Sequence, residues 1–565
     1  MNKPARRIIE YMTIQILLFC SVIIAQSDSI KTDPLSKQIV KKYFHYSGNF
    51  GSYGELYSTT AENKRRPSST ARSSLNMTFT FWKFQVPIEL TFSTEEVTYR
   101  QSFNRLGINP QWKFIKFRVG DFGGRTSEYT VSGISIRGGG IEIEPSWMRL
   151  YFYYGTTQRA IEDPRAQTYA FKRKLIAGKL GFGKKESIYF DINVIKAVDD
   201  ENSINEPLDS INVNPMENIA VSLEGQLQLF KRKFRLGGEL AASVISLNTL
   251  ADKGEVDDVP SWVDNIYTIR LSSRMDYAVK TDMSINTRPF NLKLTYNRVG
   301  PGYMSLGLPY TNNDRVRYMG SANVWLIPSK WSVRMLYNYS YDNLENTKVK
   351  TLKHNMVNIN TMIRPVPGLS FNVGYNKNTL KNETNLDSLI YWENNIEKKR
   401  LLFDTFNDRY IVSANYSYRL MNINQSTAVS FSLQRSEKKN EEASKNPFDA
   451  NIFTIGQNFM FSSKLTAGLT GTFSGNKVDT LTIKTNTFGV NLGYNPMRFW
   501  RNTATFSMQK TGQQKALNYN LTMRFRVTAR SNLNLSFYKI DFIDPKNPSR
   551  EYKEHRGVLT YNYSF

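Results

Sequence analysis

Seven basic residues stand where a positive charge could act on a solute. Each alternates with apolar neighbours, as Arg334 does between Val333 and Met335. Alternate side chains of an extended strand point to opposite faces, so the base points away from the apolar face. Such charges could form a field that attracts anions. The alternative is that they pair with carboxylates such as Asp276 and only fill space. The seven are Arg149, Arg270, Arg274, Lys293, Arg334, Arg524 and Arg526.

The three histidines are the other reactive groups to consider. His354 and His555 each follow a loop and have carboxylates such as Asp342 and Glu554 in their vicinity along the chain. A position at the same rim of the fold does not make these residues a catalytic triad, and no serine nucleophile motif accompanies the histidines. We therefore interpret His45, His354 and His555 as structural or solvent-facing, and we predict no catalytic residues and no enzyme.

No cofactor or metal site is expected either. The acidic run Glu437–Asp449 lacks the spacing of a calcium loop. The stretch GGRTSEYTVSG lacks the strand-to-helix setting of a phosphate loop, and its glycines favour a bend, a bulge or an inward fold. Cys20, the one cysteine, lies in a segment expected to be removed, so no thiolate site remains.

The elements that carry these residues are strands. Apolar and polar residues alternate along most of the chain, for example in WSVRMLYNYSY and LNMTFTFW. About two dozen such segments of roughly ten residues match tilted membrane strands. Their apolar face is rich in Tyr, Phe and Trp, as in interfacial girdles, and the other face is Ser, Thr, Asn, Gly and Arg. The pattern predicts an all-β, transmembrane, antiparallel up-and-down β-barrel.

Composition and the start of the chain agree with an exported barrel. The 13% aromatic content excludes an ordinary disordered chain. A mean hydropathy of −0.45, with no long apolar run, excludes a helical membrane protein. The apolar run Ile14–Ala25 follows Lys3, Arg6 and Arg7, which is typical of a cleaved signal peptide. We predict residues 1–25 as the signal, 26–42 as a short periplasmic lead and 43–565 as one barrel domain.

Connection lengths predict the orientation of the barrel. Long connections such as Val299–Arg315 and Leu380–Asp408 alternate with tight turns such as Thr528–Ser531. Short turns are periplasmic and long loops extracellular in such barrels, so both termini are expected in the periplasm. We predict about 24 strands (22–26) and no separate plug domain. The alternation fails upstream of Trp147, where part of Phe103–Gly140 is expected to fold inward.

The last strand carries a recognisable signature. Tyr561, Tyr563 and Phe565 occupy alternate positions up to the terminal residue. This resembles the C-terminal signal of bacterial outer-membrane barrels, which implies recognition by the barrel assembly machinery and a location in the Gram-negative outer membrane. The block Phe103–Gly155 and the composition also resemble large outer-membrane barrels of Bacteroidota.

A porin-like channel with a basic lumen that favours anionic solutes is the function expected from these features. The net charge of +25 suits an anionic solute or lipopolysaccharide better than nucleic acid, which an exported chain would not meet. The alternative is a barrel of a secretion or envelope-assembly complex, with a periplasmic or lipoprotein partner in the lumen. An outer-membrane enzyme or adhesin is the third possibility.

Overall fold

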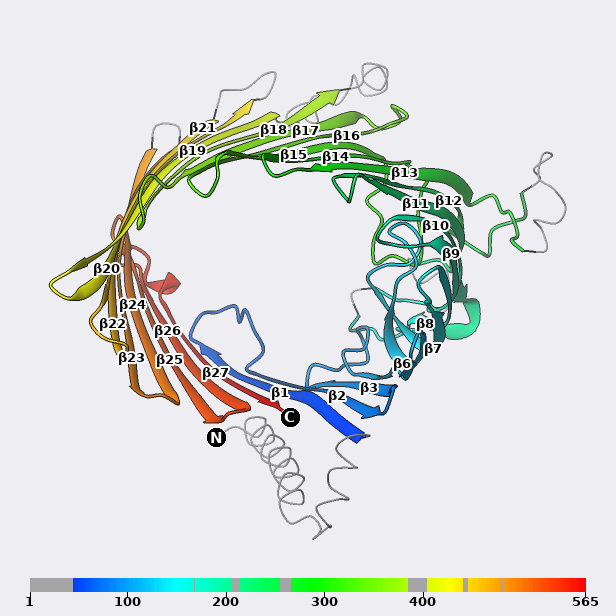
Figure 1. Cartoon of the computed structure of the whole chain (residues 1–565), viewed down its shortest axis with the longest axis horizontal. Coiled ribbons are helices and arrows are strands. Elements are labelled where there is room, and N and C mark those ends of the chain that lie inside the picture. The colour runs from blue at the N-terminus through cyan, green and yellow to red at the C-terminus, as the bar shows by residue number, and fades with distance from the viewer. Residues whose placement is uncertain are drawn as a thin grey trace, which may run out of the picture.

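The computed structural model is one antiparallel sheet that closes on itself (Figure 1). The structure describes residues 44–166, 168–205, 213–254, 266–384, 404–439, 446–478 and 481–565. The predicted signal and periplasmic lead lie outside these residues. Within them, no helix is both long and apolar enough to cross a membrane.

The strands follow one another around the ring in chain order. They are β1 (Phe44–Thr59), β2 (Ser69–Phe81), β3 (Phe84–Ser93), β4 (Arg105–Ile108), β5 (Gln111–Trp112), β6 (Ile115–Gly124), β7 (Ile134–Ile143), β8 (Met148–Gln158), β9 (Lys172–Gly183), β10 (Ile188–Asp200), β11 (Glu217–Leu229), β12 (Phe234–Ser246), β13 (Ser273–Asn286) and β14 (Phe290–Val299). The second half comprises β15 (Arg315–Ile327), β16 (Trp331–Asp342), β17 (Lys350–Ile363), β18 (Leu369–Thr384), β19 (Asp404–Leu420), β20 (Ile423–Lys439), β21 (Asn446–Met460), β22 (Leu465–Val478), β23 (Leu481–Met497), β24 (Trp500–Thr511), β25 (Gln514–Thr528), β26 (Ser531–Ile543) and β27 (Tyr552–Ser564).

The first and last strands close the barrel. β1 and β27 pair from Asn49 opposite Ser564 to Thr59 opposite Glu554. Beyond that pairing, Gly48 and the terminal Phe565 exchange two backbone hydrogen bonds of 3.0 Å. This closure pairs the two end strands, as a wall in hydrocarbon requires because its backbone polar groups must be hydrogen-bonded. β4 and β5 both lie between β3 and β6 as one interrupted span, so the 27 described strands make 26 spans. That number lies within the predicted range.

Alternation produces an apolar outer face. On β8, Leu150, Phe152 and Tyr154 are exposed on the outside, whereas Tyr151 and Tyr153 are buried on the inside. Exposed large apolar side chains recur at alternate positions around the ring. An apolar exterior of this kind is suited to lipid.

Tight turns lie at the end of the barrel that holds the termini. Met421 and Asn422, for example, have φ values of 48° and 63° and join β19 to β20 in two residues. Positive φ at both positions is the geometry of the hairpin turn whose twist matches the strands. The predicted turn Thr528–Ser531 also lies at this end.

Two connections at the opposite end fold into the barrel. Residues 125–133 join β6 to β7, which agrees with the expectation that part of Phe103–Gly140 turns inward. Residues 300–314 join β14 to β15 and also lie inside. The long connection predicted at Val299–Arg315 is therefore present at the end opposite the termini, but it folds into the lumen, which the sequence analysis did not predict. The central part of Leu380–Asp408 lies outside the described residues.

Candidate functional site

Loop 125–133 is held against the inner wall by charged side chains. The carboxylate of Glu239 on β12 accepts the backbone N–H of Tyr129 at 3.3 Å. The Lys179 ammonium on β9 donates to the Thr126 carbonyl at 2.7 Å. Because these wall groups are buried, bonding to the loop compensates for the loss of their hydration. The loop and the wall therefore stabilise one another.

Loop 300–314 lies on the first loop and on the wall beside it. Its Leu306 N–H donates to Asn218 Oδ1 at 3.1 Å, and Asn218 Nδ2 donates to the Met304 carbonyl at 3.1 Å. Ser305 Oγ donates to the carbonyl of Thr130 at 2.7 Å. Asn218 is fully buried on β11, so a single wall residue satisfies the backbone of the loop at two points.

An apolar cluster joins both loops to the wall. Tyr129 and Tyr303, one from each loop, meet edge to face with ring centroids 6.0 Å apart. Leu306 and Val131 pack with apolar residues of β6 to β12 in a continuous buried cluster. We call loops 125–133 and 300–314 together the inner layer. Figure 1 shows it along one side of the ring, next to β6 to β13.

Buried ion pairs neutralise the bases of this side. Arg149 and Asp191 are 2% and 1% exposed and lie 2.6 Å apart, and Lys179 approaches the same carboxylate at 2.8 Å. Arg149 also donates to the Gly183 carbonyl at 2.6 Å. A buried charge without a partner costs several kcal/mol, so this pairing is required once the inner layer has excluded water. Here the second interpretation of the basic residues, pairing with carboxylates, describes Arg149.

A polar cavity of about 410 Å³ lies beneath loop 125–133. Its lining combines bases such as Arg118 and Arg125 with carboxylates such as Glu142 and Glu224. Arg118 holds Glu142 through two hydrogen bonds of 2.8 and 3.1 Å. The two signs of charge are interspersed, so this cavity suits water or a zwitterionic group better than a free anion.

The opposite side of the lumen is uncovered in the part of the chain that the structure describes. Strand register directs small polar side chains of β18 to β27 inward, and many are exposed. They include Asn415, Ser417, Thr470, Asn491 and Thr503. The lumen therefore has a filled side, lined by β6 to β13 and the inner layer, and an open side, formed by the inner faces of β15 to β27.

Arginines of the open side bond to neutral groups. Arg334 Nε donates to Asn323 Oδ1 at 2.9 Å, and Arg524 Nε donates to Asn534 Oδ1 at 3.1 Å. Arg409, which the sequence analysis did not single out, donates to Ser432 Oγ at 3.1 Å. None of the three is in an ion pair with a described carboxylate. Their full positive charge faces the lumen, in contrast to Arg149.

The remaining basic candidates occupy different settings. Lys293 faces inward at 3.7 Å from Asp282, with 60% of its side chain exposed. Arg274 is an exposed inward position at the start of β13. Arg526 donates to the Ala529 carbonyl in the turn below β25. Arg270 lies before β13 and donates to the Ala251 carbonyl. The assumed strand alternation therefore does not reach Arg270, because the chain there pairs within a loop.

The sequence analysis predicted the long connection Val299–Arg315 but missed that its residues 300–314 fold inward. The sequence GPGYMSLGLP does contain a signal for the inward fold. A solvated loop would not carry so many apolar residues, which are Tyr303, Met304, Leu306 and Leu308. Asp191 was also missed as the partner of Arg149. Strand pairing of β8, β9 and β10 brings the two together, which no spacing in the sequence reveals.

The histidines show no catalytic arrangement among the described residues. His354 Nε2 lies 2.6 Å from Asn378 Oδ1 on the inner face, and the register places His555 on the outer face. No described group of three or more His, Cys, Asp or Glu could hold a metal ion.

The three C-terminal aromatic residues face outward near the barrel seam. The rings of Tyr563 and Phe565 stack with their centroids 5.7 Å apart. The ring centroid of Tyr561 lies 6.4 Å from that of Phe50 on β1. Their rings thus cover the junction of the first and last strands on the outer face.

An electrostatic contact joins two loops at the end of the barrel opposite the termini. Glu96 accepts the backbone N–H groups of Phe103 and Asn104 at 2.6 and 3.0 Å and pairs with Arg159 at 3.0 Å. Burial alone would raise the pKa of the Glu96 carboxyl, but these bonds, one from Ser102 and the Arg159 charge outweigh it. The net pKa is below its ordinary value.

Comparison with known proteins adds only distant similarities. No family model matches the chain, and no curated protein sequence matches it. A P pilus usher translocation pore, PapC, is 10% identical at a TM-score of 0.36, with 92% of this chain and 99% of that chain covered. An Escherichia coli pilus assembly intermediate that contains PapC gives 10% identity and a TM-score of 0.45, covering 91% of this chain and 60% of that chain. OccK8 (OprE) of Pseudomonas aeruginosa is 9% identical at a TM-score of 0.31, with 70% of this chain and 98% of that chain covered. At these scores the similarities carry no functional conclusion.

Proposed function

We propose that this chain is an outer-membrane channel whose open side passes small solutes and favours anions. The apolar exterior and polar interior of the closed wall support a membrane pore. The inner layer narrows a barrel that would otherwise leave a wide lumen. Short turns at the end of the barrel that holds the termini support a periplasmic position for that end.

The observation that carries the anion preference is the different pairing of arginines on the two sides. On the filled side, carboxylates neutralise bases such as Arg149. On the open side, Arg334, Arg409 and Arg524 bond only to amide or hydroxyl oxygens among the described residues. A pore lined by unneutralised bases concentrates anions and repels cations.

Selective conduction can be tested in a planar bilayer under a salt gradient. The wild type is expected to give an anion-favouring reversal potential. The variant with Arg334→Gln, Arg409→Gln and Arg524→Gln is expected to lose most of that preference, with its conductance level retained. Lys353→Gln is the matched control, since Lys353 lies on the outer face beside Glu383. A steady open current without anion preference would refute the role of these arginines.

The uncovered inner face would also suit a partner protein that occupies the lumen. In that second function the chain is the barrel of a secretion or envelope-assembly complex. A correctly folded but silent barrel, together with a soluble or lipid-anchored protein that copurifies in a fixed ratio, would favour the second function. A steady current from the chain alone favours the first.

A further inference from the structure

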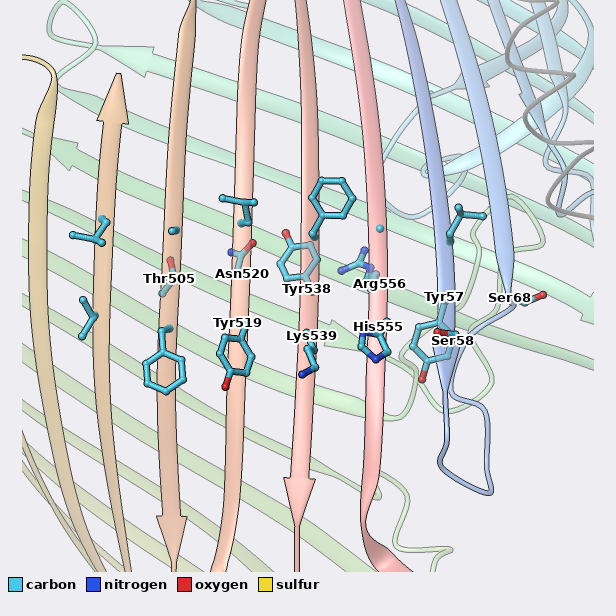
Figure 2. Close-up of a pocket in the computed structure, with 18 residues that line it drawn as sticks. Tyr57, Ser58, Ser68, Thr505, Tyr519, Asn520, Tyr538, Lys539, His555 and Arg556 are labelled. Carbon is cyan, nitrogen blue, oxygen red and sulfur yellow. The ribbon is translucent and has the colours of Figure 1, made fainter. Parts of the chain in front are cut away.

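A groove of about 710 Å³ lies on the outer face of the barrel, over β23 to β27 and β1 (Figure 2). Its walls are apolar side chains that the strand register directs toward lipid, such as Leu521 and Phe537. It lies on the side of the wall opposite the lumen, so neither the inner layer nor the conduction path uses it.

Small residues between large ones make the groove. Gly557 is directly opposite Phe537 on β26 and Leu56 on β1, both of which are exposed. A Cβ added at Gly557 would meet nothing within 4 Å, so the position is an open notch. The two flanking strands are about 10 Å apart, which is enough for one acyl chain. Ala504, between Leu492 and Leu521, repeats the arrangement.

Polar and basic groups lie next to the notch on the outer face, on the side nearer the long-loop end of the barrel. One step farther along the outer face, His555 is opposite Lys539 and Ser58. Figure 2 shows Tyr519, Lys539 and His555 in one row across β25 to β27. The Lys539 ammonium lies 5.3 Å from the centre of the Tyr519 ring and 2.7 Å from Asp541. A row of aromatic and basic groups is expected where hydrocarbon gives way to lipid headgroups.

Unpaired lysines lie beyond that row, at the long-loop end of the same strands. Lys510 and Lys515 are directly opposite each other, both exposed on the outer face. Lys553 is exposed beyond His555. No described carboxylate forms an ion pair with any of these three lysines. Like charges directly opposite in a sheet repel, and a bound anion would relieve that repulsion.

We propose that this groove binds a phosphorylated glycolipid of the outer leaflet, with an acyl chain over Gly557 and phosphates among the lysines. The position on the lipid-facing wall and the net positive charge above an apolar notch specify an anionic lipid. Lys515 on β25 and Lys553 on β27 lie on strands about 10 Å apart, and Lys510 lies one strand farther from Lys553. That spacing fits a lipid headgroup with a phosphate at each end better than a headgroup with a single phosphate. The inference rests on the membrane placement in the proposed function, but not on conduction.

The test is native mass spectrometry of the full chain released from detergent that contains bisphosphorylated lipid A. The wild type is expected to retain one lipid. Gly557→Leu, which fills the notch, is expected to lower retention severalfold. Gly475→Leu is the matched control, because Gly475 faces outward on β22 with nothing within 4 Å of an added Cβ. If Gly557→Leu fails to fold, Ala504→Leu fills the second notch instead.

The charges are tested separately from the notch. Lys510→Gln, Lys515→Gln and Lys553→Gln are each expected to weaken retention about fivefold, whereas Lys353→Gln should leave it unchanged. Dephosphorylated lipid and phosphatidylglycerol should be retained less than lipid A by the wild type. Equal retention by all variants, or equal retention of phosphatidylglycerol, would overturn the proposal. A silent barrel that still retains lipid A would refute the channel and leave this site standing.

Discussion

Leu306 is the position at which the inner layer can be loosened with the smallest change. Its side chain is 5% exposed and belongs to the apolar cluster that also contains Val131 of the other loop and Ile195 of the wall. Truncation in Leu306→Ala removes this contact and leaves the hydrogen bond between the Leu306 N–H and Asn218 in place. The variant therefore weakens docking of loop 300–314 without breaking the barrel wall.

The expected magnitude follows from the burial. Leu→Ala substitutions in packed cores cost about 2–5 kcal/mol. The lower half of that range applies, because the site borders a lumen and water can enter the space left behind. A loss of about 2–3 kcal/mol raises the population of the undocked loop about 30- to 150-fold, at about 1.4 kcal/mol per factor of ten. An undocked loop moves into the open side and interrupts the current.

Single-channel recording measures this directly. Transitions between current levels should be much more frequent in Leu306→Ala than in the wild type. Tyr310→Ala is the matched control, since Tyr310 is in the same loop but 80% exposed, and its record should match the wild type. Heat-modifiable mobility on a gel verifies folding of each variant. Identical records for a folded Leu306→Ala and the wild type would refute the docking of this loop as a determinant of the current.

Three further predictions concern stability and assembly. Asp191→Asn should lower the free energy of unfolding by about 3–5 kcal/mol in urea titration, because it leaves Arg149 buried without its countercharge; an unchanged midpoint would contradict this. The depressed pKa of Glu96 means that its contact with Arg159 contributes stability above the unfolded pKa of about 4.3 and loses it as pH falls through the lower folded value. Protease cleavage of these outer loops should stay constant from pH 7 to 5 and rise only below about pH 4; an increase already at pH 6 would show that another group is responsible. Phe565→Ala should reduce the folded fraction in the outer membrane while refolding in detergent is retained, and equal reductions in both would indicate a purely structural role.

The alternation of apolar and polar side chains is a local property of the sequence, and it was sufficient to predict the class of fold. Residues such as Leu150, Phe152 and Tyr154 must share a face in any extended chain, so the sequence alone predicts strands, an apolar exterior and the inward direction of Arg334 and Arg524. Turn positions such as Thr528–Ser531 were also predictable, because short polar connections between alternating segments have few conformations.

The sequence predicted that part of Phe103–Gly140 folds inward, but it predicted neither the second inner segment nor the wall contacts of either one. Whether a connection such as 300–314 extends outward or folds inward depends on contacts with strands far away in the chain, such as that between Leu306 and Asn218. Likewise, Arg149 and Arg334 have the same local pattern, yet only Arg149 meets a carboxylate, because the register of β8 to β10 brings Asp191 beside it. Periodicity fixes the face to which a side chain points. Closure of the sheet and docking of the inner layer decide which groups it meets there, because these contacts join residues that are distant in sequence.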